Sequence, residues 1–468
     1  MAYSLLNELE GVVPYRYVYD YASDTLEALE PDAPMPRDLD LLLVSLPYEL
    51  DYPYAARCLA HGGIRIPLKS ERRPVVVGGG VAASSNPAPL LGVLDAVVIG
   101  DAEGILEELP YIARDEGAEG LCKLGAVLVY GFCSERVRKN VAMLSAVPRY
   151  ALMQAHPLEE EPIYGCGLRL EVSRGCPRMC AFCLEGHVTR PFRFYSESSV
   201  MDAIERWLDV YPFKRVVIYS LSLLDVPYAR RLLEELRNMT VEASVPSLRP
   251  DYVDENVVEL VRDLGQKTLT IAPESLNPEV ACRVGKCYDP SDLAKVIEKA
   301  RGLGMNVKLY LIAGLPGESP AELAKGVKRF LDTLSEPTRR AIRISINPLI
   351  PKPWTPTQFL SHSYPYVVSK DLRKALRGVS ASCDVMDWRW GVVQAFIALG
   401  DESTSRHVVD WGLEGFRASE ARKLLRYESR GQRVWEVMVD LGIPASYLRS
   451  RFEYLSSFDE RWRSAGEA

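Results

Sequence analysis

The sequence predicts an α/β protein in three parts: a doubly wound N-terminal sheet, an open parallel barrel in the centre and a mostly helical C-terminal region. Short apolar strands alternate with helical patterns over the first 135 residues, and six strand–helix repeats follow between Leu168 and Asn347. Such alternation is typical of parallel sheets built from βα units. At 468 residues the chain is too long for one ordinary core, so several domains are expected.

The first predicted domain, residues 1–135, is Rossmann-like. Its apolar strand patterns lie at 41–47, 74–80, 95–103 and 125–132, with a helical pattern at 53–61 after the first of them. Gly78 and Gly79 end the second strand, where a ligand's phosphate or backbone could approach closely, although a glycine run also suits a tight turn. Residues 136–164, which contain EEEP at 159–162, are predicted to be a linker.

The second predicted domain, residues 165–356, is a partial (β/α)6 barrel. In its last strand, Ile342, Ile344 and Ile346 share one face while Arg343 and Ser345 share the other. A polar face repeated across parallel strands implies a concave interior filled by solvent or ligand, with the active site at the carboxyl ends of the strands. Residues 357–468 form the predicted helical domain. The expected strands are 168–173, 215–220, 241–246, 267–273, 306–313 and 341–347.

Three cysteines, Cys176, Cys180 and Cys183, follow the first barrel strand at the spacing CxxxCxxC. Three closely spaced thiolates on one loop can ligate three irons of a four-iron cluster and leave the fourth iron open to an external ligand. The alternative is a structural zinc site, since His187 follows four residues later and Cys3His is a tetrahedral zinc set. The position of the loop at the start of a long βα run favours the cluster.

The remaining composition suits a soluble cytoplasmic protein. No apolar run approaches the roughly 18–20 residues of a membrane span, and the N-terminus lacks the pattern of a signal peptide. The formal net charge of −7 gives no general attraction to nucleic acid. Most other cysteines are expected to be buried free thiols, with a second cluster or a disulfide considered for the close pair Cys282 and Cys287. These others are Cys58, Cys122, Cys133, Cys166, Cys282, Cys287 and Cys383.

The motif RGCPRMCAFC, with Phe182 before the last cysteine, closely resembles the signature of the radical S-adenosylmethionine (SAM) superfamily. VVVGGGVAASSNPAPL and LDAVVIGDAEGILEEL resemble the cobalamin-binding domain that precedes many radical SAM barrels. The layout, together with LTIAPESLNPE, KLYLIAGLPGE and PKPWTPTQF, resembles a largely uncharacterised branch of cobalamin-binding-domain radical SAM proteins. The resemblance covers roughly residues 40–400.

The resemblance implies a 4Fe-4S cluster on Cys176, Cys180 and Cys183 and SAM as the ligand of its open iron. Reductive cleavage would give methionine and a 5′-deoxyadenosyl radical, with a ferredoxin or flavodoxin as the reducing partner. Lys308 and Tyr310 share the inner face of one strand and are the candidate catalytic residues at the substrate. The cofactor-binding positions that it implies are Phe182, Tyr219, Ser220, Ser244, Arg249, Glu274, Gly314, Leu315, Pro316 and, for cobalamin, Ser45, Gly78 and Gly79.

Cobalamin binding stays open at this point. Domains that hold cobalamin with a histidine carry an Asp-x-His-x-x-Gly loop, whereas this chain has no histidine before His61. Either cobalamin binds without a histidine ligand, or the domain is a scaffold.

The leading functional hypothesis is a radical SAM enzyme, with cobalamin-assisted methyl transfer as one reaction; the substrate, small molecule or RNA, is unknown. The alternative is an RNA-modifying methylthiotransferase, which needs a second set of three cluster cysteines. Only Cys58, Cys122 and Cys133 are available for it. The third hypothesis is a non-catalytic, zinc-containing nucleic-acid-binding protein.

Overall fold

The contacts of the chain divide it into two compact units. Unit 1 comprises residues 1–147, 351–354 and 392–447, and unit 2 comprises residues 148–350, 355–391 and 448–468. Residues 351–354 and 392–447 therefore group with the N-terminal sheet rather than with a separate C-terminal domain. The computed structural model describes residues 2–68, 74–133, 135–147, 152, 167–211, 213–417, 419–426 and 433–466.

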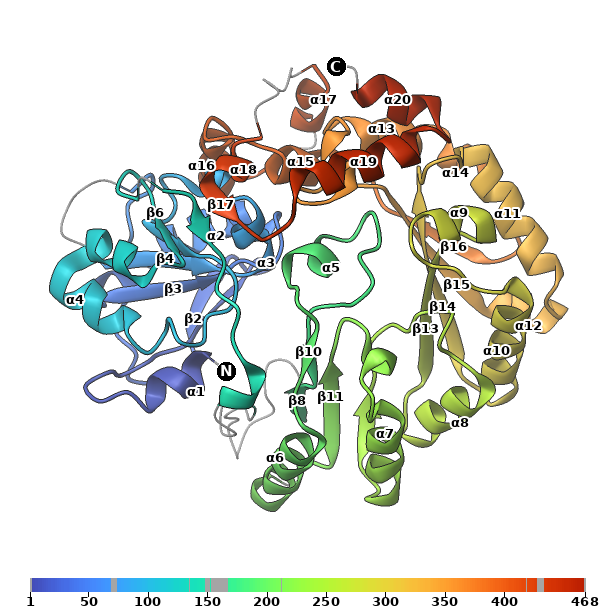
Figure 1. The fold of residues 1–468 in the computed structure, drawn as a ribbon, viewed down its shortest axis with the longest axis horizontal. Helices are drawn as coiled ribbons and strands as arrows, with labels where there is room; N and C mark the ends of the chain where they lie inside the picture. The colour runs from blue at the N-terminus through green and yellow to red at the C-terminus, as the bar shows by residue number, and fades with distance from the viewer. Residues whose placement is uncertain are drawn as a thin grey trace. The chain divides into compact units, whose positions relative to one another are not determined.

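Unit 1 is built on a four-stranded sheet with the order β3-β4-β5-β6 (Figure 1). All four strands lie in the segments that the sequence predicts, and β3, β4 and β5 are parallel. The last strand, β6, runs antiparallel to β5, which the apolar pattern alone did not reveal. The strands are β3 (Leu41–Ser45), β4 (Val75–Gly79), β5 (Ala96–Val98) and β6 (Val127–Val129).

Helices cover the sheet of unit 1 and bury its valines. One core cluster joins Val77, Val127 and Val129 of the sheet to Leu109 and Ala113 of α4. The helices are α1 (Ala2–Asn7), α2 (Asp51–His61), α3 (Val81–Ser85), α4 (Leu109–Gly120), α16 (Thr404–Glu414), α17 (Glu420–Leu424) and α18 (Trp435–Met438), with 3-10 turns η1 (Pro36–Asp38), η2 (Ala88–Leu90), η3 (Leu121–Leu124) and η4 (Leu144–Ala146).

Two small ladders complete unit 1. Strands β1 (Tyr17–Asp20) and β2 (Thr25–Ala28) form an antiparallel pair. Strand β7 (Val137–Arg138) pairs in parallel with β17 (Val439–Asp440). The start of the predicted linker is therefore part of unit 1, while 148–151 and 153–164 lie outside the described residues.

Unit 2 contains the predicted open parallel barrel, with all six expected strands present. The order is β8-β11-β12 and then β13-β14-β15-β16, and a parallel bridge between Leu248 and Ile271 joins the two groups. A seventh strand, β16, extends the edge and was not predicted. The strands are β8 (Leu168–Glu171), β11 (Arg215–Tyr219), β12 (Glu242–Ser244), β13 (Thr268–Glu274), β14 (Asn306–Ala313), β15 (Ile342–Pro348) and β16 (Ser382–Val385).

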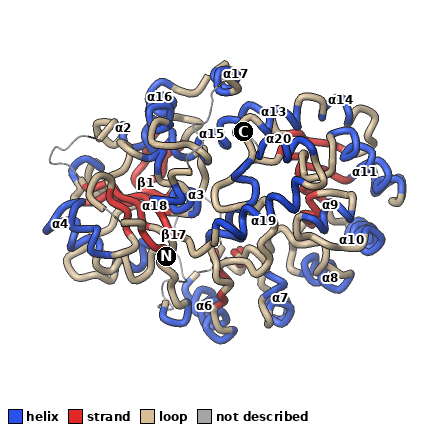
Figure 2. The backbone as a smooth tube through the Cα atoms, turned by 45° about the horizontal axis from the view of Figure 1, so that its top comes forward, coloured by secondary structure: helices blue, strands red, loops and turns tan. Residues whose placement is uncertain are grey.

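The helices of unit 2 follow its strands, as right-handed βα crossovers require. Figure 2 shows α6, α7, α8 and α10 in succession along the rim of this unit, and α10 contacts β14. The helices are α5 (Leu184–Val188), α6 (Glu197–Val210), α7 (Ala229–Asn238), α8 (Glu255–Asp263), α9 (Pro278–Arg283), α10 (Pro290–Gly302), α11 (Pro320–Asp332), α12 (Glu336–Ala341), α13 (Tyr364–Ser369), α14 (Leu372–Ala375), α20 (Glu460–Gly466) and, extending into unit 1, α15 (Trp388–Ala398) and α19 (Ala445–Ser456), with turns η6 (Leu223–Asp225) and η7 (Pro356–Phe359).

The strand faces of unit 2 alternate as predicted. In β14, Val307, Leu309 and Leu311 are buried, whereas Lys308 and Tyr310 remain partly exposed on the other face. The same alternation holds in β13 and β15. The buried face packs against the helices and leaves a polar inner face. None of the helices in the described part of the chain has the length and apolar character that crossing a membrane requires.

Candidate active site

The three cysteines of the CxxxCxxC motif lie on one loop at the carboxyl end of β8. A short antiparallel ladder closes this loop, because β9 (Ser173–Arg174) pairs with β10 (Arg193–Phe194). Cys180 is buried, and Cys176 and Cys183 are partly exposed. The loop thus presents three thiols together at the end of the barrel where active sites gather.

Two N–H groups point at the sulfur atoms of this loop. The backbone N–H of Gly186 donates to Cys183 Sγ at 3.3 Å, and Arg249 Nη1 donates to Cys180 Sγ at 3.4 Å. Hydrogen bonds to ligating sulfurs help to set the potential of an iron–sulfur cluster. The donor set of three thiols, two of them with N–H donors, fits a four-iron cluster.

Burial disfavours the charged form of these thiols when no metal is bound. It raises the pKa of Cys183 to about 12, with the Gly186 N–H acting in the opposite direction, and it also raises the pKa of Cys176. Metal binding must therefore displace thiol protons. Within the described ranges, no three His, Cys, Asp or Glu side chains converge on a position that could hold a single metal ion.

An ion pair inside the cysteine loop fixes it to the neighbouring strand ends. Arg178, between the first two cysteines, binds Asp225 at 2.6 Å, and Asp225 also accepts from Tyr252 Oη at 3.0 Å and Ser222 Oγ at 2.7 Å. The guanidinium carbon of Arg178 lies 5.0 Å from the centre of the Tyr252 ring. Sequence reasoning missed this group, although Asp225 lies six residues after Tyr219, the last residue of β11.

The predicted SAM-contacting residues Tyr219, Ser220 and Ser244 lie at the ends of β11 and β12. Tyr219 is 52% exposed, and Ser220 Oγ lies 2.6 Å from Ser173 Oγ on the strand that leads into the cysteine loop. Ser244 is half-buried at the last position of β12. The structure brings Ser220 next to the cysteine loop.

Arg249 contacts the cysteine loop rather than open space. Besides Cys180, it donates to both oxygens of Asp251 at 3.0 Å and to the backbone oxygen of Gly285 at 3.0 Å. Gly285 has φ of +99°, and a Cβ there would lie 3.3 Å from Cys180 Cα. The guanidinium thus joins two loops around one sulfur.

Glu274 belongs to a buried ion pair. Its Oε1 accepts from Lys286 Nζ at 2.6 Å, and the same ammonium donates to the backbone oxygen of Ala272 at 2.7 Å. Burial raises the pKa of Glu274, and Lys286 acts in the opposite direction. Lys286 Nζ also lies 5.9 Å from the centre of the Phe182 ring. Glu274 and Phe182, both predicted to contact SAM, therefore share one neighbour.

Gly314, Leu315 and Pro316 follow β14 as a buried turn. Gly314 has φ of +94°, and its backbone oxygen accepts from Tyr364 Oη at 2.8 Å. Leu315 joins a core cluster with Ala181 of the cysteine loop and Trp462 of α20. The turn therefore packs against the cysteine loop, and its contact with adenine stays a prediction.

Lys308 and Tyr310 share the inner face of β14, as predicted. The ammonium of Lys308 lies 4.6 Å from the centre of the Tyr310 ring, an arrangement that a cation–π attraction stabilises. Neighbouring strands place Thr270 and Arg343 beside Lys308, and Ser345 beside Tyr310. These polar side chains line the barrel interior.

Glu318 is a buried carboxyl group that sequence reasoning did not single out. Its side chain is 1% exposed, Oε1 accepts from Ser275 Oγ at 2.8 Å, and Oε2 has no hydrogen-bond partner among the described residues. Burial raises its pKa to about 7, with Glu322 adding to the rise and Ser275 and Arg461 opposing it. A carboxyl group whose pKa is higher in the folded state stabilises the fold below its unfolded pKa, and this contribution is lost as the pH rises through about 7.

We therefore expect Glu318→Gln to be about 1–3 kcal/mol more stable than the parent chain at pH 8 and nearly equal to it at pH 5. Urea denaturation of both proteins at the two pH values measures the difference. Glu234→Gln, at an exposed position of α7, is the control and should change stability by less than about 0.5 kcal/mol. A pH-independent effect of the Glu318 substitution would contradict the prediction.

The residues predicted for cobalamin lie at the carboxyl ends of β3 and β4 in unit 1. Ser45 is exposed and pairs in register with Gly79. A Cβ at Gly78 would overlap Leu94 Cδ1, and one at Gly79 would lie 3.8 Å from Val98 Cβ. Packing inside the unit therefore explains the glycine at position 78, and a ligand contact there stays a prediction.

The remaining cysteines differ in part from expectation. Cys58 and Cys383 are half-buried free thiols, as predicted. Cys122 and Cys133 form a disulfide, so the free-thiol prediction is wrong for them. Cys122 lies in η3 and Cys133 follows β6, and the two side chains meet beside the core of unit 1. Cys282 and Cys287 also form a disulfide, one of the two alternatives considered for that pair. Cys166 lies outside the described residues.

Comparison of the sequence with protein-family models identifies the superfamily to which the chain belongs. The model of the radical SAM superfamily matches residues 170–329, and the model of the N-terminal region of radical SAM proteins matches residues 3–127. The chain belongs to the radical SAM superfamily. The first match covers the cysteine loop and the strands to β14, so the loop and its surroundings are those of a radical SAM enzyme.

Two proteins of Methanocaldococcus jannaschii are similar to this radical SAM chain. One, named "Uncharacterized protein MJ0966", is 29% identical over 381 residues, which is 80% of each chain. The other, named "Putative methylthiotransferase MJ0865", is 25% identical over 271 residues, 54% of this chain and 56% of the relative.

Among solved structures, the radical SAM methyltransferase TsrM from Kitasatospora setae, with cobalamin and a [4Fe-4S] cluster bound, has a similar fold. The TM-score is 0.50 at 17% identity, over 92% of this chain and 89% of that chain. The likeness thus extends over both units of the radical SAM chain.

Proposed function

We propose that this radical SAM enzyme holds a 4Fe-4S cluster on Cys176, Cys180 and Cys183 and cleaves SAM reductively. The observation that carries the proposal is the set of three thiols on one loop at the carboxyl end of β8, two of which accept N–H hydrogen bonds. A cluster bound there, with SAM on its open iron, would supply an electron that splits SAM into methionine and a 5′-deoxyadenosyl radical. A ferredoxin or flavodoxin in the cytoplasm would supply that electron.

Residues of the chain hold the cysteine loop in place and line the barrel interior next to it. Arg178 and Asp225 hold the loop against the ends of β11 and β12, and Arg249 gives Cys180 its N–H donor. Lys308 and Tyr310 lie on the polar inner face of β14, where a substrate inside the barrel would contact them. We propose these two as the residues that bind the group from which hydrogen is abstracted.

Methyl transfer fits the cysteine arrangement better than methylthio transfer does. The second reaction needs three further cluster cysteines, for which Cys58, Cys122 and Cys133 were the candidates. Cys122 and Cys133 are bonded to each other, and Cys58 lies on α2 as a free thiol with a pKa raised by burial to about 11. We therefore propose cobalamin-assisted methyl transfer. Ser45 and Gly79, at the carboxyl ends of β3 and β4 in unit 1, would contact the cobalamin.

Anaerobic reconstitution tests the proposal. The chain is loaded with iron and sulfide and then incubated with SAM, dithionite and hydroxocobalamin, while 5′-deoxyadenosine and bound corrinoid are measured together. We expect about four irons per chain, 5′-deoxyadenosine and bound corrinoid. Deoxyadenosine without corrinoid would reject the cobalamin part and return methylthio transfer to consideration. One zinc per chain and no deoxyadenosine would contradict the whole proposal.

A further inference from the structure

The disulfide between Cys282 and Cys287 lies at the surface of unit 2. Cys282 is in the last turn of α9 and Cys287 follows it by five residues, with the two Cα atoms 4.0 Å apart. Both cysteines are exposed. Exposed disulfides are open to attack by external thiols, and labile or catalytic disulfides are usually of this kind. The bond is therefore chemically accessible in the folded chain.

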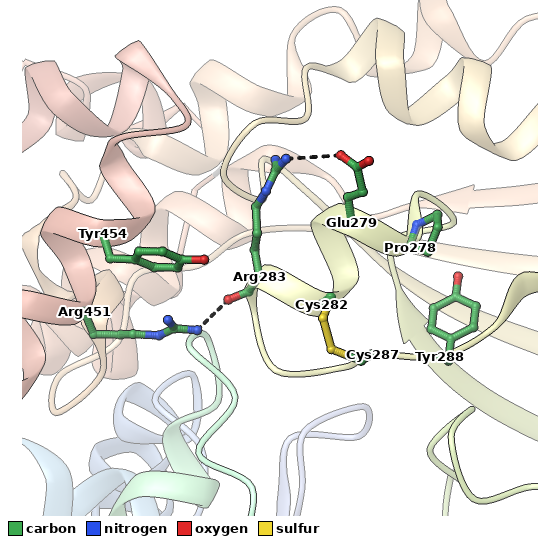
Figure 3. Close-up of a pocket in the computed structure, with 8 residues that line it drawn as sticks. All are labelled: Pro278, Glu279, Cys282, Arg283, Cys287, Tyr288, Arg451 and Tyr454. Carbon is green, nitrogen blue, oxygen red and sulfur yellow. Dashed lines mark hydrogen bonds and ion pairs between the residues drawn. A yellow bond between two sulfur atoms is a disulfide. The ribbon is translucent and has the colours of Figure 1, made fainter.

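The disulfide forms part of the wall of a pocket of about 680 Å³ between α9 and α19 (Figure 3). The guanidinium groups of Arg283 and Arg451 face this pocket together with one carboxylate, Glu279, so its formal charge is positive. Tyr288 and Tyr454 supply aromatic surface. The lining residues are Pro278, Glu279, Cys282, Arg283, Cys287, Tyr288, Arg451 and Tyr454.

The two arginines are held in place without being neutralised by buried acids. Arg451 Nη2 donates to the backbone oxygen of Arg283 at 2.6 Å, and its guanidinium carbon lies 4.8 Å from the centre of the Tyr454 ring. Arg283 is 3.4 Å from Glu279, whose side chain is 79% exposed. Guanidinium groups fixed in this way are suited to carboxylate and other oxyanions.

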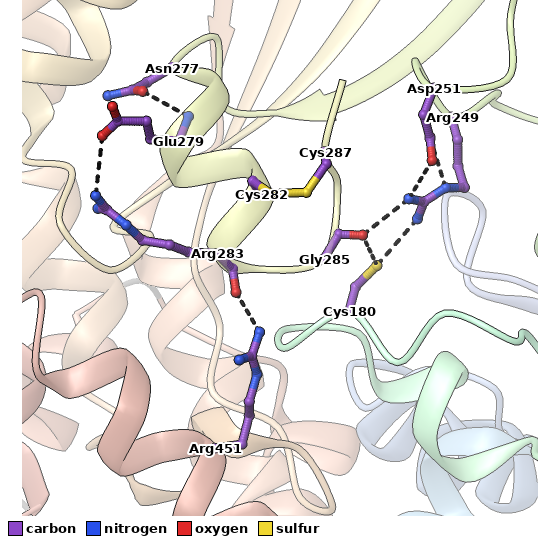
Figure 4. Close-up of a disulfide and its surroundings, with 10 residues drawn as sticks. All are labelled: Cys180, Arg249, Asp251, Asn277, Glu279, Cys282, Arg283, Gly285, Cys287 and Arg451. Carbon is purple, nitrogen blue, oxygen red and sulfur yellow. Dashed lines mark hydrogen bonds and ion pairs between the residues drawn. A yellow bond between two sulfur atoms is a disulfide. The ribbon is translucent and has the colours of Figure 1, made fainter. Parts of the chain in front are cut away.

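The loop closed by this disulfide contacts the cysteine loop of the candidate active site (Figure 4). The N–H of Ala181 donates to the backbone oxygen of Val284 at 3.0 Å, and Cys180 Sγ lies 3.7 Å from the backbone oxygen of Gly285. Arg249 bridges that same oxygen and Cys180. The disulfide therefore closes a segment whose backbone oxygens contact Cys180 and Ala181 of the cysteine loop.

We propose that Cys282–Cys287 is a thiol–disulfide exchange site whose pocket takes a small anionic thiol. The thiolate of the incoming molecule attacks one sulfur, forms a mixed disulfide and releases the other cysteine as a thiolate, which takes up a proton. A second thiol molecule attacks the mixed disulfide. Two cysteine thiols and one disulfide of the small thiol result, so the protein disulfide gains two electrons and two protons from two thiol molecules.

The exchange is independent of cluster chemistry and is tested on the full chain without added iron. The oxidised protein is treated with 3-mercaptopropionate, 2-mercaptoethanol or cysteamine at equal thiolate concentration. Reduction is followed by acid quenching, alkylation and peptide mass spectrometry. At Cys282–Cys287 we expect the anionic thiol to react about three- to tenfold faster than the neutral one, and the cationic thiol to react most slowly. The Cys122–Cys133 disulfide, partly buried in unit 1, is the internal control and should show no such order.

Charge variants at the pocket separate this proposal from general thiol reactivity. Arg451→Gln should remove most of the preference for 3-mercaptopropionate, and Glu279→Gln should increase that preference. Arg449→Gln is the matched control, because this arginine of α19 lies over the Phe359 ring and does not line the pocket. Equal rates for the three thiols, or equal preferences in the Arg451 and Arg449 variants, would overturn the proposal, as would free Cys282 and Cys287 in the oxidised chain.

The contact with Cys180 gives a second readout that does not need the cluster. Reduction releases the loop that holds Gly285, so alkylation of Cys180 in the iron-free chain should become faster once Cys282–Cys287 is reduced. The variant Cys282→Ser/Cys287→Ser should show the faster rate under all conditions. An unchanged rate of Cys180 alkylation would reject the coupling between the two loops, even where 5′-deoxyadenosine assays support the proposed cluster.

Discussion

Cys180→Ala is expected to abolish cluster assembly while leaving the fold in place. The iron content after anaerobic reconstitution should fall from about four per chain to background, because the two cysteines that remain cannot hold a cubane cluster. Formation of 5′-deoxyadenosine should fall at least about a hundredfold, since no cluster is left to deliver the electron. The fold should survive because, among the described residues, the sulfur is hydrogen-bonded to Arg249 and the Gly285 backbone oxygen and to no element of the barrel sheet.

Cys383→Ala is the matched control for this prediction. Cys383 is also a free cysteine of unit 2, but it lies on β16 at the edge of the barrel sheet. It should keep the full iron content and activity. Circular dichroism and urea denaturation of both apo variants should show stability changes of no more than about 1–2 kcal/mol. Parental iron content in Cys180→Ala would remove this cysteine from the ligand set.

The barrel was predictable because its strands repeat one local pattern. Each of the six predicted barrel strands, β8 and β11 to β15, is a short segment followed by a helical segment, and the structure confirms all six. The cysteine loop was equally readable, since its three cysteines lie within eight residues after a strand. Local periodicity and local spacing carry this information without any knowledge of distant contacts.

Features that depend on distant contacts were not predictable. The short edge strand β16 reads SCDV, so only Cys383 and Val385 mark its half-buried face, and the strand forms because β15 offers it a parallel partner. The direction of β6 is decided by the path of the chain around it, because Val-Leu-Val suits either orientation. Segment 351–354 belongs to unit 1 through contacts such as the 2.8 Å hydrogen bond from Trp354 Nε1 to the backbone oxygen of Ser85.

The same limit applies to the site. Arg249 was predicted to contact SAM from its place after a strand end, yet its bond to Cys180 joins residues 69 positions apart. The pairing of Glu274 with Lys286 depends on the turn after α9, which the disulfide also shapes. Sequence spacing identifies which residue types gather at the strand ends, whereas the pairing among them depends on the folded loops.

The largest effect on stability is expected for Lys286→Met. Lys286 and Glu274 are 8% and 7% exposed, so removal of the ammonium leaves a buried carboxylate without its hydrogen-bonded counter-charge. Breaking such a pair on one side costs about 3–5 kcal/mol. The folded-state pKa of Glu274, already raised by burial, should rise further without Lys286. The loss should therefore be larger at pH 8 than at pH 5, because a raised pKa favours the neutral, protonated form of the buried carboxyl as the pH falls. Urea denaturation of the apo chain at both pH values measures it.

The double variant Glu274→Met/Lys286→Met shows whether the loss comes from the unpaired charge or from the altered shape of the loop. Replacement of both members of a buried pair by apolar groups of similar size is often nearly neutral, so most of the stability should return. Lys295→Met is the surface control: its ion pair with Asp292 is 64% and 66% exposed and should be worth less than about 1 kcal/mol. If the double variant is as unstable as Lys286→Met, the lysine acts through packing beside Phe182 and the Ala272 backbone, and its charge contributes little.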